Sequence, residues 1–94
     1  MRTIEGFKLR KLGNEYILVG DSMALINFYK MITLNETAAF LWEQAQNATA
    51  QHGEFDTAEL CKALCGEYEV APEQAMTDVD ATISSWLEAG VIEK

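Results

Sequence analysis

The chain has 94 residues, of which 49% are hydrophobic and 23% are charged. This length suits a single domain, residues 1–94, whose core is large enough to fold without a metal or a disulfide. The composition excludes a disordered or collagen-like chain. No apolar run approaches the roughly 18 residues of a membrane-spanning helix, and the N-terminal segment is too charged for a signal peptide. We therefore expect a cytoplasmic protein that has no membrane partner and keeps its two cysteines reduced.

The net charge of −8 is distributed unevenly along the chain. Residues 1–35 carry five basic and three acidic side chains, a net charge of +2, whereas residues 36–94 carry two basic and twelve acidic side chains, a net charge of −10. The second part would repel DNA, because neutralisation of phosphates supplies most non-specific affinity for nucleic acid. The charge favours a cationic partner, or one complementary to a local patch, and argues against a nucleic-acid partner.

The first third of the chain has the alternation typical of strands. Residues 7–10 alternate apolar and basic side chains, and residues 16–19 are rich in β-branched and aromatic side chains. Between them, Gly13-Asn14 predicts a two-residue hairpin turn. Residues 28–33 form the third predicted strand. Three such strands predict a small antiparallel sheet with two free edges.

In the remainder of the chain the apolar period changes from two to 3.6, which indicates helices. Asn35 is the predicted N-cap of a first helix that ends before Gly53, and Asp56 with Glu59 predicts the capping box of a second helix. Pro72 stands at the first position of a predicted third helix. Strands followed by helices imply an α+β domain, and this order also suggests a winged-helix core. The apolar stripes expected in the core are Ala38, Leu41, Trp42, Ala45 and Ala48 in the first helix, Leu60, Cys61, Leu64, Cys65 and Tyr68 in the second, and Ala75, Met76, Val79, Ile83, Trp86 and Leu87 in the third.

Few side chains offer catalytic chemistry. His52 is the only histidine, and its place near a predicted helix end indicates a solvated residue rather than part of a nucleophile–base pair. Cys61 and Cys65 are one helical turn apart, a spacing at which two thiolates can share a metal. Both lie within the predicted apolar stripe, however, and are expected to be core residues. We therefore predict no enzyme activity, no catalytic residues, no cofactor and no metal site.

One flank of the third predicted helix has the character of a binding groove. Asp78, Thr82 and Ser85 follow one side of its apolar stripe, and the small side chains among them let another chain approach closely. A free strand edge beside this flank would offer backbone donors and acceptors. Together these features suit β-augmentation, in which a peptide adds a strand to a sheet. An ordinary surface flank is the alternative.

The ordered set of motifs resembles the PqqD family, named after the pyrroloquinoline quinone biosynthesis protein D. Residues 31–38, Met-Ile-Thr-Leu-Asn-Glu-Thr-Ala, with Trp42 shortly after them, match the family's strand-to-helix core. Residues 86–92, Trp-Leu-x-x-Gly-Val-Ile, match its ending, and residues 5–10 match a common opening. The segment from Glu43 to Glu54 is longer than the family's usual connection, so the first helix or its loop is expected to be extended.

The resemblance implies a winged-helix-like domain with a three-stranded antiparallel sheet followed by three α-helices. It also implies a non-catalytic peptide chaperone, which binds the leader segment of a ribosomally synthesised precursor peptide by strand addition. Such a protein presents the leader to a modifying enzyme, often a radical SAM enzyme. The implied groove lies between the third strand and the third helix. Its residues are Phe28, Tyr29, Lys30, Met31, Ile32, Thr33, Asp78, Thr82 and Ser85.

Two other functions remain open at this point. A protein–protein adaptor would use the same sheet edge, for example to form a homodimer. A DNA-binding winged helix would need lysine or arginine on the exposed face of its third helix, and the sequence has neither between Pro72 and Gly90. The adaptor is therefore the stronger alternative.

Overall fold

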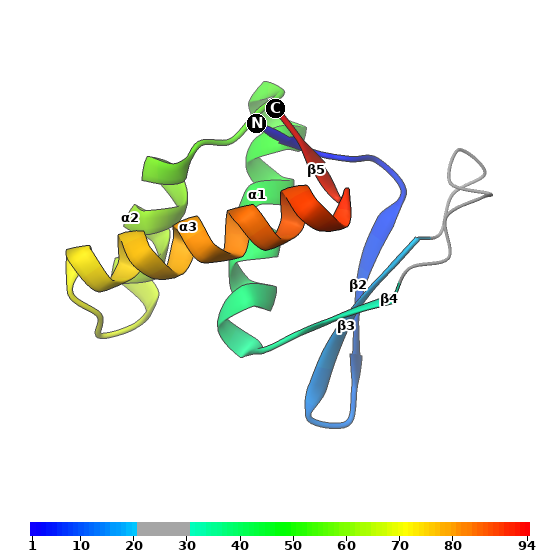
Figure 1. Cartoon of the computed structure of the whole chain (residues 1–94), viewed down its shortest axis with the longest axis horizontal. Coiled ribbons are helices and arrows are strands. Elements are labelled where there is room, and N and C mark those ends of the chain that lie inside the picture. Colours follow the sequence, from blue (N-terminus) through cyan, green and yellow to red (C-terminus); the bar gives the residue numbers. More distant parts are fainter. Residues whose placement is uncertain (21–30) are drawn as a thin grey trace.

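The computed structural model, which describes residues 1–20 and 31–94, has a three-stranded sheet on one side of a group of helices (Figure 1). Strands β2 (Phe7–Leu12), β3 (Glu15–Gly20) and β4 (Met31–Leu34) lie in that order and are antiparallel. The pairing sets Leu18 of β3 between Leu9 of β2 and Ile32 of β4. The predicted antiparallel sheet is confirmed over the residues that the structure describes.

The turn between β2 and β3 is the predicted two-residue hairpin. Leu12 pairs with Glu15, which leaves Gly13 and Asn14 as the loop. Gly13 has a φ of 63°, and no residue other than glycine has a positive φ within the described part of the chain. A positive φ at the first loop position alone fits a type II′ turn, in which glycine takes that position without steric cost.

Three helices follow the sheet: α1 (Glu36–His52), α2 (Thr57–Glu67) and α3 (Pro72–Ala89). α3 crosses α1 in Figure 1, and α2 packs against both of them. None of the helices described is long and apolar enough to cross a membrane. The three predicted helices are confirmed, and with the sheet they confirm the predicted α+β class.

A second, two-stranded sheet was not predicted. Strands β1 (Arg2–Thr3) and β5 (Ile92–Glu93) pair antiparallel, so the two ends of the chain lie side by side (Figure 1). Ile4 N–H also donates to the carbonyl of Val91, and Phe55 N–H to the carbonyl of Met1, at 3.0 Å and 2.7 Å. These bonds attach the first residues of the chain to the helical part.

The core lies between the sheet and the helices. Phe7, Leu18 and Leu34 are buried on the sheet face that packs against α1. At the centre of the helical layer, Trp42 and Trp86 meet edge to face, with ring centroids 5.3 Å apart and ring planes at 90°. Both tryptophans are almost fully buried, so the prediction that they are core residues is confirmed.

Two of the residues predicted for the apolar stripes are not core residues, because Cys65 is exposed and Met76 is 44% exposed. Four others are half-buried and pack against the edge of the core: Ala38, Cys61, Tyr68 and Leu87. The reason is that α2 buries only Leu60 and Leu64, one turn apart, along the single row that faces its neighbours. The next positions around the helix therefore lie at the rim of the α2–α3 contact.

Candidate functional site

A pocket of about 270 Å³ lies where β4 passes into α1, opposite α3. It is shallow and open. Its volume is slightly below the roughly 300–1,000 Å³ that typically enclose a small-molecule ligand, so it suits one or two side chains better than a cofactor. We call it the β4–α3 pocket. It is lined by Ile32, Thr33, Leu34, Asn35, Ala38, Ala81, Thr82, Ser85 and Trp86.

The floor of the β4–α3 pocket is apolar and rigid, and its rim is polar. Leu34 and Trp86 are buried, and the edge-to-face contact with Trp42 restricts the position of the Trp86 ring. On the rim, the hydroxyl of Thr82 donates to the backbone carbonyl of Asp78 at 2.8 Å, which fixes its orientation. The pocket can therefore take an apolar side chain whose backbone lies along a polar rim.

One wall of the pocket is the edge of a sheet. β4 pairs with β3, and within residues 1–20 and 31–94 no strand pairs with its other edge. In an antiparallel strand every second residue points its N–H and C=O away from the paired neighbour. The edge of β4 thus presents backbone donors and acceptors beside the pocket, which is the arrangement that β-augmentation requires.

The other wall of the pocket belongs to α3, whose charged side chains are all acidic. α3 carries four acidic residues and no basic residue. Asp78 lies one turn before Thr82 and is half-buried, and its Oδ1 accepts a hydrogen bond from Nε2 of Gln74 at 2.9 Å. Such a wall favours a ligand with neutral or cationic side chains on this side, because an acidic one would meet repulsion.

Several of the predicted groove residues are brought together in this pocket. Ile32 and Thr33 of β4 face Thr82 and Ser85 of α3 across it. Met31 belongs to β4, whereas Asp78 does not line the pocket and reaches it only through the backbone contact with Thr82. The remaining predicted groove residues, Phe28, Tyr29 and Lys30, lie outside the described residues.

Five lining residues were missed by the sequence reasoning. Ala38 and Trp86 had been assigned to apolar stripes, and a residue at the border of such a stripe can pack on the core and also line a pocket. Ala81 adjoins Thr82 on the same flank of α3, and its small size was an available signal. Leu34 and Asn35 complete the lining at the end of β4.

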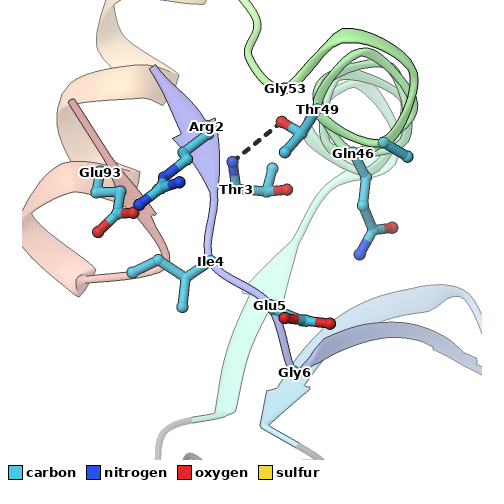
Figure 2. A pocket seen from close by; sticks show the side chains of 10 residues that line it. Arg2, Thr3, Ile4, Glu5, Gly6, Gln46, Thr49, Gly53 and Glu93 are labelled. Atoms are coloured by element: carbon cyan, nitrogen blue, oxygen red, sulfur yellow. Dashed lines mark hydrogen bonds and ion pairs between the residues drawn. The ribbon is translucent and has the colours of Figure 1, made fainter.

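A larger hollow, of about 570 Å³, lies between the N-terminal segment and α1 (Figure 2). Gln46, Thr49, Ala50 and Gly53 form its helical wall, and residues 2–6 form the extended wall. We call it the N-terminal pocket. At its rim the side chain of Arg2 forms an ion pair with Glu93.

Several backbone N–H groups in the extended wall of the N-terminal pocket already donate hydrogen bonds within the protein. Thr3 N–H donates to Oγ1 of Thr49 at 3.2 Å, as Figure 2 shows, and Ile4 N–H donates to Val91. On the helical side, Nε2 of Gln46 donates to the carbonyl of Phe7 at 3.1 Å. An added strand would find few free partners here, so the β4–α3 pocket is the better candidate despite its smaller volume.

These contacts also show what the extended segment from Glu43 to Glu54 does. It continues α1 to His52, and Gly53 ends the helix in the left-handed conformation, with a φ of 85°. Gln46 and Thr49 on this extension anchor the N-terminal segment. The longer connection expected from the sequence is therefore helical, and it holds β1 in place.

Comparisons with known proteins address the family and the fold. A family model described as coenzyme PQQ synthesis protein D (PqqD) matches residues 22–92. No curated protein sequence matches the chain. Among solved structures, the fold is similar to that of "TbiB1 in Complex with the TbiA(beta) Leader Peptide", with a TM-score of 0.75 and 14% sequence identity. The similarity covers 99% of this chain and 95% of that chain.

Proposed function

Because the chain belongs to the PqqD family, we propose that it is a non-catalytic protein that binds the leader segment of a ribosomally synthesised precursor peptide. The leader adds a strand to the outer edge of β4, and one of its apolar side chains enters the β4–α3 pocket. The observation that carries this proposal is the position of the pocket directly beside that edge. The similarity of fold to TbiB1, which was solved with a leader peptide, supports it.

The two parts of this groove contribute differently to binding. β4 has four residues, and each hydrogen bond to its edge contributes only about 0.5–1.5 kcal/mol net. Backbone bonds also do not distinguish one peptide sequence from another. Selectivity must therefore come from the side chains that enter the pocket and from the acidic wall of α3. Since the leader loses conformational freedom on binding, we expect a dissociation constant near about 1 μM.

In this proposal the bound leader is presented to a modifying enzyme of the radical SAM class. The side chains that line the β4–α3 pocket are hydroxyl, amide and apolar groups, with no base placed to activate a hydroxyl. Chemistry on the precursor then belongs to the partner enzyme, and this protein supplies recognition. The partner and the leader would meet on the face that β4 and α3 share.

Hydrogen exchange tests the site of strand addition. When the cognate leader is added, the exchange rate of the β4 amide protons that point away from β3 is expected to fall by about tenfold or more, because these protons become hydrogen-bonded. The amides of β1 should not change, since the N-terminal pocket lies elsewhere. Mass spectrometry of short peptides from residues 31–35 and 1–6 measures both. Slower exchange in residues 1–6 alone would contradict the proposal.

The adaptor alternative gives a different result in the same experiment. If a second copy of the chain occupies the edge of β4, slower exchange of these amides should depend on protein concentration without any peptide. The mass in size-exclusion chromatography should then double, and added leader should have no effect.

Duplex DNA is expected not to bind, even at low salt where electrostatic attraction is strongest. Residues 36–94 have a net charge of −10, and the third helix has no basic side chain with which to contact phosphates. An electrophoretic shift assay at about 10 mM salt, where screening extends to roughly 30 Å, is the most permissive test. A mobility shift of the DNA at micromolar protein concentration would contradict this prediction and support the DNA-binding alternative.

A further inference from the structure

Three sulfur-containing side chains lie where α2 and α3 pack together. Cys61 and Cys65 are one turn apart on α2, and Met76, in the N-terminal half of α3, contacts Cys61. Sγ of Cys61 lies 3.8 Å from Sδ of Met76. None of the three lines the β4–α3 pocket, so the proposed peptide-binding site does not use them.

The sulfur atoms of this cluster are accessible. Cys65 and Met76 are exposed and Cys61 is half-buried, so an ion from solvent can reach them without opening the core. The core beneath them is formed by Leu60 and Leu64, which hold α2 in place independently of the sulfurs. At the surface end of this contact, Met76 is exposed and its thioether lies against the thiol of Cys61.

The set of donors discriminates among metals. Zinc takes four nitrogen, sulfur or oxygen ligands in a tetrahedron. Across residues 1–20 and 31–94, no group of three or more histidine, cysteine, aspartate and glutamate side chains could hold a metal ion. Two thiolates and a thioether are instead a small set of soft donors, the kind that selects Cu(I).

We propose that Cys61, Cys65 and Met76 form a binding site for one Cu(I) ion. On binding, each thiol loses its proton to solvent and its sulfur forms a bond to the metal, and the thioether of Met76 donates a lone pair as the third ligand. The oxidation state of copper does not change, so no oxidant or reductant takes part. The site is separate from the β4–α3 pocket and does not depend on the proposed peptide-binding function.

Anaerobic titration of the chain with Cu(I), in competition with a chromophoric Cu(I) chelator, tests this site. We expect one Cu(I) per chain and an affinity that falls as the pH is lowered, because protons compete for the thiolates. Cys61→Ser and Cys65→Ser should each weaken binding by about tenfold or more, as should Met76→Leu, which keeps the apolar volume but loses the sulfur. The adjacent, exposed Thr77 provides a control, since Thr77→Leu should bind as the native chain does.

The outcomes separate a three-sulfur site from simpler explanations. Full-strength binding by Met76→Leu would overturn the proposal, because the thioether would then not be a ligand. So would binding unaffected by either serine substitution, or no competition with the chelator by the native chain. Circular dichroism of each variant establishes that it is folded. Because Met76 is exposed, Met76→Leu is expected to fold even if a serine variant does not.

Discussion

Replacement of Thr82 by arginine is expected to weaken binding of the cognate leader by about tenfold or more, roughly 1.4 kcal/mol. Thr82 lines the β4–α3 pocket opposite Ile32 and Thr33, so a long side chain there would occupy the space that the peptide needs. Backbone hydrogen bonds to the edge of β4 cannot be removed by a side-chain substitution, and a steric block therefore tests the groove more directly. Isothermal titration calorimetry with the leader peptide measures the effect.

Thr77→Arg is the matched control for this experiment. Thr77 is exposed on α3, does not line the pocket, and donates from Oγ1 to the carbonyl four residues earlier, at 3.1 Å. Thr82 makes the equivalent bond to Asp78 at 2.8 Å, so the two substitutions remove the same interaction and add the same charge. Loss of affinity in Thr77→Arg but not in Thr82→Arg would place the binding surface on another face of α3. No loss in either variant would exclude the β4–α3 pocket.

The helix boundaries were predictable because local chemistry sets them. Oδ1 of Asn35 accepts from Ala38 N–H at 2.8 Å, and Oδ1 of Asp56 accepts from Glu59 N–H at 2.7 Å. Each of these caps involves residues three positions apart, so it can be recognised in the sequence without knowledge of the fold. Gly90, which ends α3 with a φ of 79°, was predictable for the same reason.

The β1–β5 pair was not predictable, because it depends on residues at opposite ends of the chain. Each strand has two residues, too few for an alternating pattern, and Arg2 pairs with Glu93. The same limit applies to the N-terminal pocket, whose walls come from β1 and from the C-terminal half of α1. Residues 5–10 and the extended segment from Glu43 to Glu54 were noted in the sequence, but nothing in either indicated that they would face one another.

The candidate site lies between these two cases. The free edge of β4 and the small residues of α3 were separate local features, and the resemblance to the PqqD family supplied their juxtaposition. Apolar patterning indicated that Trp86 and Ala38 face inward, but it could not indicate that both border an open pocket. For Cys65 the same patterning was wrong, because α2 buries a single row of side chains.

Truncation of Trp42 is expected to have the largest effect on stability. Trp42 is fully buried in the core and meets Trp86 edge to face, so Trp42→Ala leaves a cavity between α1 and α3. Such a substitution lowers the free energy of unfolding by about 3–5 kcal/mol. A domain of this size has a total of roughly 5–15 kcal/mol, so the loss amounts to about a fifth of that total or more. Urea denaturation followed by circular dichroism measures the change.

Trp42→Phe is the informative companion variant. Nε1 of Trp42 is buried and has no hydrogen-bond partner among the described residues, so phenylalanine loses volume but no hydrogen bond. We expect it to cost less than half as much as alanine, and an equal cost would contradict this account of the indole N–H. The variant also keeps Trp86 as the only tryptophan, because the chain has two. Since Trp86 lines the β4–α3 pocket, its fluorescence should change when the leader binds, and an unchanged spectrum at saturation would place the peptide elsewhere.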